Sequence, residues 1–374
     1  MKKFFLYFSA FAFVACLVLS EMTVNAAIDV SAKSAVVLDS ASSAVLFEKN
    51  AYEKLPMAST TKIMTGLILA EEPNLDREIT VTKEMVTVEG SSMGLIPGDT
   101  VSLYALLCGL MLASGNDAAN TIAIVLCGST EKFAEVMNNK ARQIGMENTN
   151  FVTPSGLDDE NHYSTAYDMA MLASEALRNP IFAEVVSSKS KTVSYGNPPY
   201  LRTLKNHNKM LSLYDGAVGV KTGFTKKSGR CLVSAAAGAG STVIAVTLND
   251  PDDWNDHQKM LDYGISNSAE FISDKYFVPL VGGESGKVET VCRRPDFEKV
   301  YGETDNLKYS VSLPKFVYPD IKKGDVLGSV EVLYKGVCVF KGDISAVCDY
   351  GAERIDFVPK PDFFYMFKKI LSFK

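Results

Sequence analysis

A serine and a lysine three residues apart offer the clearest catalytic chemistry in this chain. Ser59 and Lys62 are the ends of the sequence Ser-Thr-Thr-Lys, and apolar residues such as Ile63, Met64 and Leu67 follow. Residues i and i+3 lie on one face of a helix, so a neutral Lys62 amine can take the Ser59 proton as the hydroxyl attacks a carbonyl. The spacing therefore predicts a serine nucleophile with a lysine base.

The same spacing recurs elsewhere, and each further copy has a simpler explanation. Ser129 precedes an apolar helical pattern and fits a helix N-cap. The copy that begins at Ser188 lies in a polar stretch, and Pro314 disrupts a helix in the copy that begins at Ser312. Only Ser59 opens an apolar helix and is followed by two further motifs in a fixed order.

Those two motifs are Ser114-Gly115-Asn116 and Lys221-Thr222-Gly223, and the patterns Ser-x-Asn and Lys-Thr-Gly each occur once. Together with Ser-x-x-Lys they form the motif set of penicillin-binding proteins and related β-lactamases. The chain resembles these enzymes, and most of all the low-molecular-mass D-alanyl-D-alanine carboxypeptidases. The flanking residues that carry the resemblance include Met57-Ala58, Asp117-Ala118-Ala119, Pro154-Ser155-Gly156-Leu157, His162-Tyr163-Ser164 and Phe224-Thr225.

The resemblance implies a hydrolase that removes the last D-alanine from peptidoglycan stem peptides and is acylated by β-lactam antibiotics. Ser59 would attack the carbonyl between two terminal D-alanines, and water would then hydrolyse the acyl-enzyme. Burial and a nearby Lys221 cation would both favour the neutral form of Lys62. Ser114 is expected to relay the proton to the leaving amine. Whether Lys62 acts directly or through water stays open.

The other motif residues are expected to bind substrate. Asn116 offers an amide that can hold both Lys62 and the substrate backbone. Lys221 and the Thr222 hydroxyl suit the free carboxylate that defines a carboxypeptidase substrate. Gly223 leaves room for a substrate strand to lie alongside.

The resemblance also places an oxyanion hole. It would consist of the backbone N–H of Ser59 and that of Phe224, and losing one such donor typically costs roughly 100- to 1,000-fold in rate. Phe224 stands where some relatives have histidine, which preserves the backbone donor and leaves fine specificity open.

Two histidines are possible catalytic residues. His162 with Asp168 could suggest a Ser-His-Asp triad, but no serine is presented on a nucleophile elbow, so we expect His162 to hydrogen-bond within its loop. His207, between two asparagines, either contacts substrate or is structural. We expect no cofactor and no metal, because three histidines without any Cys-x-x-Cys do not match zinc-ligand spacing.

Three other activities share parts of this pattern. A β-lactamase has the same motifs and also needs fast deacylation, usually through a glutamate between the second and third motifs, where the sequence has no Glu-x-x-Leu-Asn. A transpeptidase would pass the acyl group to an amine. A wall-binding or signalling protein with an inactive site is the non-enzymatic alternative, and the presence of all the polar groups argues against it.

The sequence patterns at both ends of the chain differ from those of a globular domain. Residues 1–26 are expected to be a signal peptide, because Lys2 and Lys3 precede an apolar stretch that ends in small residues. Residues 359–374 are expected to form an amphipathic helix with Phe363 and Phe367 on one face, which is typical of binding in a membrane interface. A terminal helix docked on its own protein is the alternative. The enzyme is thus expected at the outer face of the bacterial cytoplasmic membrane.

The pattern between these ends predicts an α+β catalytic domain at residues 27–273. A hairpin at 35–48 and helices at 101–113, 117–127, 129–144 and 165–178 precede strands at 219–222, 231–237 and 242–249 and a helix at 257–273. Such helices around a mainly antiparallel sheet match the penicillin-binding fold that the resemblance implies. Short alternating runs at residues 274–358 predict a small β-sandwich without catalytic groups.

The net charge and the positions of the cysteines give two further expectations. A net charge of −6 without a basic block argues against nucleic acid as a partner. Cys108, Cys127 and Cys231 lie in apolar contexts that favour free thiols, whereas Cys338 and Cys348 flank an expected hairpin and are the best disulfide candidates.

Overall fold

The computed structural model describes residues 28–41, 43–238, 241–267, 271–297 and 305–352. The expected signal peptide and the expected C-terminal helix lie outside these residues. The chain divides into two compact units at Asn267, whereas the sequence predicted the boundary after Ser273. Within the described part of the chain, no helix has the length and apolar character needed to cross a membrane.

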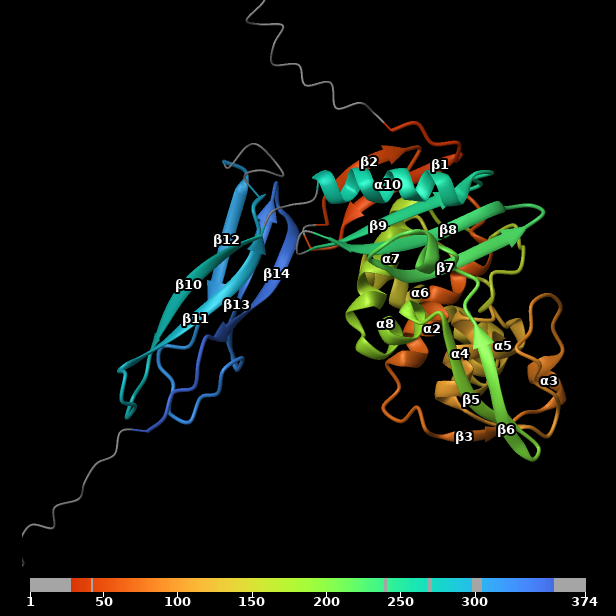
Figure 1. Ribbon diagram of the computed structural model, residues 1–374, viewed down its shortest axis with the longest axis horizontal. Coiled ribbons are helices and arrows are strands. Elements are labelled where there is room, and N and C mark those ends of the chain that lie inside the picture. Colours follow the sequence, from red (N-terminus) through yellow and green to blue (C-terminus); the bar gives the residue numbers. More distant parts are fainter. Residues whose placement is uncertain (1–27, 42, 239–240, 268–270, 298–304, 353–374) are drawn as a thin grey trace, which may run out of the picture. The chain divides into compact units, whose positions relative to one another are not determined.

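A five-stranded sheet forms the centre of the first unit (Figure 1). Its order is β2 (Val45–Lys49), β1 (Ser34–Asp39), β9 (Ser241–Leu248), β8 (Gly229–Gly238) and β7 (Ala217–Thr225). The pairs β1–β2, β1–β9 and β7–β8 are antiparallel, so the predicted hairpin and the predicted antiparallel sheet are confirmed.

Alternate residues of these strands enter two different cores, as the period of two in a strand requires. Val36 and Leu38 of β1 belong to a large core shared with most of the helices. Ala35 and Val37 belong to a smaller core shared with Met260 of α10 (Asp253–Asn267). The sheet is therefore covered on both faces, by α10 with Met210 on one side and by most of the other helices on the opposite side (Figure 1).

The large core surrounds α2 (Lys62–Ala70), which is buried along almost its whole length. The Oγ of Ser129 accepts a hydrogen bond from the Lys132 backbone nitrogen at 3.2 Å, which confirms it as the N-cap of α6. The other helices are α3 (Lys83–Val86), α4 (Leu103–Met111), α5 (Asn116–Cys127), α6 (Thr130–Ile144), α7 (Ala166–Arg178), α8 (Pro180–Ser187) and α9 (Met210–Leu213).

The predicted helix at residues 257–273 is wrong at both ends, because α10 begins at Asp253 and ends at Asn267. Ile272 continues the helical spacing of Leu261 and Ile265, which extends the apolar pattern beyond the true end of the helix. In the structure Ile272 instead pairs with Arg294 in the sheet of the second unit.

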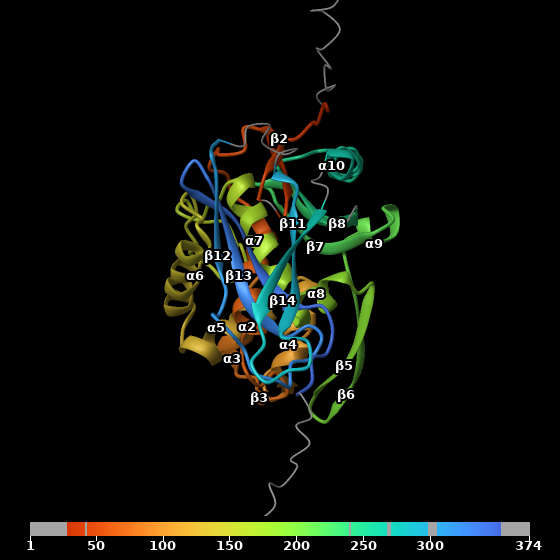
Figure 2. The same cartoon turned by 90° about the vertical axis from the view of Figure 1, so that its left-hand side faces the viewer.

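A four-stranded antiparallel sheet includes a hairpin that the sequence did not predict. Its strands are β3 (Glu78–Thr80), β4 (Thr100–Ser102), β5 (Ser190–Gly196) and β6 (Pro199–Lys205). The β5–β6 hairpin runs along the margin of the first unit in both views (Figures 1 and 2). It has mostly exposed side chains, and the Tyr195 hydroxyl donates to the Met93 carbonyl at 2.6 Å.

The second unit is β-rich, as predicted. Its strands, in sheet order, are β10 (Phe271–Pro279), β11 (Lys287–Pro295), β14 (Val337–Ala346), β13 (Val326–Tyr334) and β12 (Leu307–Ser312). They form one continuous antiparallel sheet, whereas a sandwich has two. Cys292 of β11 shares a buried core with Val330 of β13 and Ile344 of β14.

The predicted disulfide between Cys338 and Cys348 is wrong, because both thiols are free. Cys338 lies near the start of β14 and Cys348 just after its end. At about 3.3 Å per residue, the strand separates them by roughly 30 Å, far beyond the reach of a disulfide. Cys108, Cys127 and Cys231 are free, as predicted.

Candidate active site

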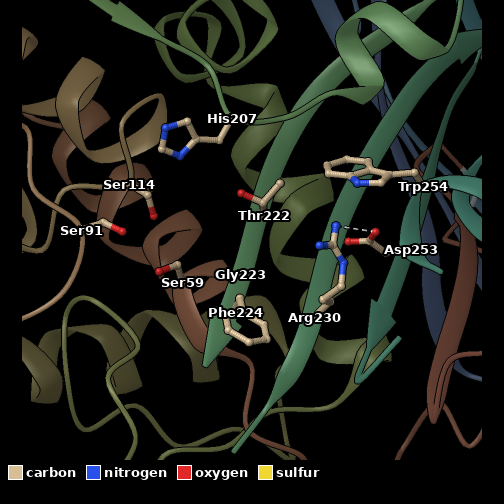
Figure 3. A pocket seen from close by; sticks show the side chains of 10 residues that line it. All are labelled: Ser59, Ser91, Ser114, His207, Thr222, Gly223, Phe224, Arg230, Asp253 and Trp254. Atoms are coloured by element: carbon tan, nitrogen blue, oxygen red, sulfur yellow. Dashed lines mark hydrogen bonds and ion pairs between the residues drawn. The ribbon is translucent and has the colours of Figure 1, made fainter. Parts of the chain in front are cut away.

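Residues from three distant segments of the first unit line one open pocket of about 310 Å³. Figure 3 shows Ser59 near Ser114, with Thr222 and Gly223 of β7 facing them across the pocket. The three sequence motifs therefore meet in space. The lining residues are Ser59, Ser91, Ser114, His207, Thr222, Gly223, Phe224, Arg230, Asp253 and Trp254.

Ser59 lies in a single 3-10 turn, η1 (Ala58–Thr61), directly before α2. Ala58 has a φ of 48°, a left-handed conformation that an L-residue adopts only at a cost in energy. The Thr60 hydroxyl donates to the Met57 carbonyl at 2.6 Å and holds the turn closed. The turn thus presents the Ser59 hydroxyl to the pocket, and Lys62 begins the buried helix behind it.

Lys62 is fully buried, and its Nζ atom has three oxygen partners. Nζ lies 2.9 Å from Ser59 Oγ, 2.8 Å from Asn116 Oδ1 and 2.7 Å from the Ser155 carbonyl oxygen. The Ser59 contact has normal hydrogen-bond length, so a proton can pass between the two side chains without an intervening water. The sequence did not predict the Ser155 contact, although the Pro-Ser-Gly-Leu segment around it belongs to the family resemblance.

Two buried lysines with lowered pKa values lie at this site. Burial lowers the pKa of Lys62 well below the ordinary 10.5, Lys221 lowers it further, and Asp117 acts in the opposite direction. Burial lowers the pKa of Lys221 to about 7, and its Nζ donates to the Thr222 carbonyl at 3.0 Å. The sequence predicted that burial and Lys221 would favour the neutral form of Lys62. A lysine must be neutral to act as a general base.

The connector between α4 and α5 carries Ser114, as predicted, whereas Asn116 already belongs to α5. Ser114 has a φ of 57°, and Asn116 is the first residue of α5. The backbone nitrogen of Asn116 donates to the Ser91 carbonyl at 2.7 Å, and its Nδ2 donates to the Glu89 carbonyl at 2.7 Å. These bonds orient the Asn116 side chain so that Oδ1 meets Lys62.

Asp117 fixes the loop that contributes Ser91 to the pocket. Its buried carboxylate accepts hydrogen bonds from the Ser92 hydroxyl at 2.6 Å and from the backbone nitrogens of residues 93–95 at 2.9, 3.1 and 3.1 Å. Hydrogen bonds to an ionised carboxylate are stronger than neutral ones, so this loop is held firmly beside the connector.

The strand β7 approaches the Ser59 turn closely because residue 223 is glycine. A Cβ at Gly223 would lie 3.0 Å from the Ser59 nitrogen and 3.1 Å from the Met57 oxygen. The backbone of β7 therefore lies beside the Ser59 N–H, which is the arrangement that an oxyanion hole needs. The Phe224 side chain is 66% exposed at the pocket mouth.

Four residues of the pocket wall were not predicted: Ser91, Arg230, Asp253 and Trp254. Arg230 lies opposite Phe224 in the β7–β8 register, and its Nη2 is 2.7 Å from Asp253 Oδ1. The Arg230 guanidinium carbon lies 5.5 Å from the Trp254 ring centroid. Burial raises the pKa of Asp253, and Arg230 opposes that rise. The arrangement adds a cation to the wall across from Ser59 (Figure 3).

His162 and His207 lie in different surroundings. Nε2 of His162 lies 2.8 Å from Thr61 Oγ1, and its Nδ1 accepts from the Val152 backbone nitrogen at 2.9 Å. Burial lowers its pKa to about 4, so it is neutral and structural, and the prediction that it bonds within its loop is confirmed. His207 lines the pocket, and burial followed by Lys221 lowers its pKa.

The chain is similar to known DD-peptidases in sequence and structure. A model of the family "D-alanyl-D-alanine carboxypeptidase" matches residues 20–252. D-alanyl-D-alanine carboxypeptidase DacF of Bacillus subtilis (strain 168) is 31% identical over 330 residues, which cover 84% of this chain and 85% of the relative. DacC of Escherichia coli (strain K12) is 34% identical over 368 residues, covering 90% and 86%.

A solved structure gives the same assignment. The Streptomyces K15 DD-transpeptidase is 34% identical, with a TM-score of 0.61, and the match covers 64% of this chain and 98% of that one. The α+β fold predicted from the motifs is thus the fold of these serine enzymes. The family match extends over most of the first unit, which contains the whole pocket. The chain therefore belongs to the D-alanyl-D-alanine carboxypeptidase family of serine penicillin-binding peptidases.

Proposed function

We propose that this protein removes the terminal D-alanine from peptidoglycan stem peptides through an acyl-enzyme on Ser59. The observation that carries the proposal is the 2.9 Å contact between Ser59 Oγ and the buried Lys62 Nζ. A lysine whose pKa lies well below 10.5 can accept the hydroxyl proton near neutral pH.

The first step forms an ester and releases D-alanine. As Ser59 Oγ bonds to the carbonyl carbon of the penultimate D-alanine, its proton passes to Lys62. The C–N bond then breaks, and the proton passes from Lys62 through the Ser114 hydroxyl to the departing amine, which leaves Lys62 neutral again. Water completes the cycle by hydrolysing the ester, with Lys62 again taking a proton.

The pocket offers a partner for each polar part of this substrate. Lys221 and Thr222 suit the terminal carboxylate, and the second amide hydrogen of Asn116 suits a backbone carbonyl. The N–H groups of Ser59 and Phe224 would stabilise the tetrahedral oxyanion. A β-lactam presents the same carbonyl and carboxylate, so it should acylate Ser59.

The acylated protein should deacylate slowly after β-lactam binding. Among the described residues that line the pocket there is no glutamate to activate a hydrolytic water. A benzylpenicillin adduct should therefore outlast the substrate ester by far. An adduct that turned over within milliseconds would favour a β-lactamase instead.

A peptide assay tests the main proposal. The full chain lacking residues 1–26, incubated with diacetyl-L-Lys-D-Ala-D-Ala, should release free D-alanine, and Ser59→Ala should lower kcat at least about 1,000-fold. Ser188→Ala is a matched control, because Ser188 has the same spacing to a lysine but bonds to the Glu184 carbonyl outside the pocket. Undiminished release by Ser59→Ala would refute the assignment of the nucleophile.

A transpeptidase is the second candidate, favoured by the similarity to a structure named as a DD-transpeptidase. It would pass the same acyl group to an amine instead of water. Adding glycine as acceptor and separating the products by chromatography distinguishes the two, because only transfer yields a glycine-terminated peptide.

Export and membrane binding form part of the proposal. Residues 1–26 would direct export, and residues 359–374 would hold the enzyme at the outer face of the cytoplasmic membrane through their aromatic and lysine side chains. Deleting residues 362–374 should release active enzyme into the soluble fraction. Continued membrane association of that variant would refute the anchor.

A further inference from the structure

A second pocket, of about 460 Å³, lies where the start of β5, the end of β6 and α9 come together. Three of its lining residues are Lys189, Lys205 and Lys209. The segment that contributes Lys205 and Lys209 also carries His207, which lines the catalytic pocket. The two pockets therefore share one stretch of backbone.

The charge of this second pocket is opposite to that of the whole chain. No aspartate or glutamate is among the described residues that line it, and none of its three lysines forms an ion pair with a described residue. The whole chain has a net charge of −6. Neighbouring ammonium groups repel one another, and an anion between them relieves that repulsion.

A buried donor without a partner lies in the same pocket wall. Asn208 is 3% exposed, and its Oδ1 accepts a hydrogen bond from the Met210 backbone nitrogen at 3.0 Å. That bond fixes the orientation of the amide, and Nδ2 has no partner. Buried N–H groups are almost always paired, so the site lacks an acceptor. An anion bound within reach of Nδ2 would supply one.

We propose that this pocket binds a phosphate group. A phosphate ester carries nearly two negative charges and three acceptor oxygens, which suits several ammonium groups better than a single carboxylate does. The volume falls within the range of about 300–1,000 Å³ typical of small-molecule sites, and Leu213, 50% exposed, gives it an apolar side. No aromatic residue is among the described residues that line it, so a stacked nucleotide base fits less well.

The chain contains a natural reporter for this site. Trp254 is its only tryptophan, and the Lys209 Nζ lies 6.0 Å from the centroid of the Trp254 ring. An anion that binds Lys209 changes the charge beside the indole, so Trp254 fluorescence should change on binding. The inference is independent of the proposed carboxypeptidase reaction, because it concerns binding alone.

Inorganic pyrophosphate is the probe. Titration of the full chain lacking residues 1–26, at low ionic strength, should give a saturable Trp254 signal and a matching calorimetric isotherm. The triple variant K189Q/K205Q/K209Q should bind at least about tenfold more weakly, since it removes all three cations. The control K83Q/K132Q/K315Q removes the same charge from exposed lysines outside the pocket and should bind like the parent protein. Unchanged thermal unfolding would verify that both variants fold.

The outcomes separate the alternatives. Absence of saturable binding, equal binding by the two triple variants, or citrate binding as tight as that of pyrophosphate would each overturn the phosphate site. If pyrophosphate binding depends on the three lysines, the affinities of glycerol 3-phosphate and inorganic phosphate are then compared. This comparison shows whether the site prefers a phosphate ester or free phosphate. Tighter binding of the ester indicates an organic phosphate, and tighter binding of inorganic phosphate indicates the free ion.

Discussion

At the scale of single residues, the account depends on a lysine that the protein keeps out of water. Lys62 has no exposed surface, and its nitrogen contacts Ser59, Asn116 and Ser155. Burial penalises the charged form, and Lys221 adds a repulsive cation nearby. The oxygen partners hold the nitrogen in place while its charge is removed, which makes it a base with fixed geometry.

The pH dependence of D-alanine release follows from these two lysines. We expect kcat/KM to rise with pH as Lys62 loses its proton and to fall as Lys221 loses its own, because the carboxylate site needs that cation. Both limbs should lie below pH 10.5, since burial lowers both pKa values. A steady-state profile with the tripeptide measures them.

The variant Lys221→Arg assigns the limbs. Arginine stays protonated, so the falling limb should disappear while the rising limb remains, even if overall activity is lower. A rising limb at or above pH 10.5 in the parent enzyme would contradict a depressed Lys62 pKa.

The sequence predicted the motif side chains of this site but not all of its wall. Ser59, Lys62 and Asn116 could be found because each belongs to a pattern of side-chain types at fixed spacing. The Ser155 contact is made by a backbone carbonyl, which leaves no side-chain signature. Arg230 reaches the pocket through the register of β8 against β7, and a sequence pattern does not determine that register.

At the scale of secondary-structure elements, the Ser59 turn depends on a glycine from another segment. Gly156 has a φ of +86°, and a Cβ there would lie 1.9 Å from the Ala58 carbonyl oxygen. The residue before it, Ser155, supplies the carbonyl that binds Lys62. The segment thus supports both the turn and the base.

Gly156→Ala should therefore slow acylation by a fluorescent penicillin at least about tenfold, because the turn must shift to admit the methyl group. Gly128→Ala is the matched control, since Gly128 has a φ of +83° with nothing within 4 Å of the added atom. It should cost roughly 1 kcal/mol in the free energy of unfolding and leave acylation unchanged. Equal acylation rates in the two variants would show that Gly156 does not position the turn.

The elements themselves were partly predictable. The β1–β2 hairpin and the helices α4 to α7 have strong apolar periodicity or capping residues. The β5–β6 hairpin was missed because most of its side chains are exposed, so its alternation is weak. The end of α10 was misplaced because apolar residues continue at helical spacing into β10.

At the scale of the whole molecule, the catalytic groups belong to one of the two units. Every lining residue of the catalytic pocket precedes Asn267. The first unit also has its own two cores, one on each face of its sheet. The second unit has separate cores, and none of its described residues lines the pocket.

A fragment of residues 28–267 should therefore fold and react. Its acylation by benzylpenicillin should stay within about threefold of that of the longer chain, because the catalytic core is intact. Stopped-flow acylation rates and a cooperative unfolding transition measure this. A large loss of acylation in a folded fragment would mean that the second unit shapes the pocket.

The most direct test of the central claim is peptide mapping by mass spectrometry after exposure to benzylpenicillin. The account predicts one covalent adduct per chain, on the peptide that contains Ser59, and no adduct in Ser59→Ala. An adduct on another serine, or none on a folded and undegraded protein, would contradict it.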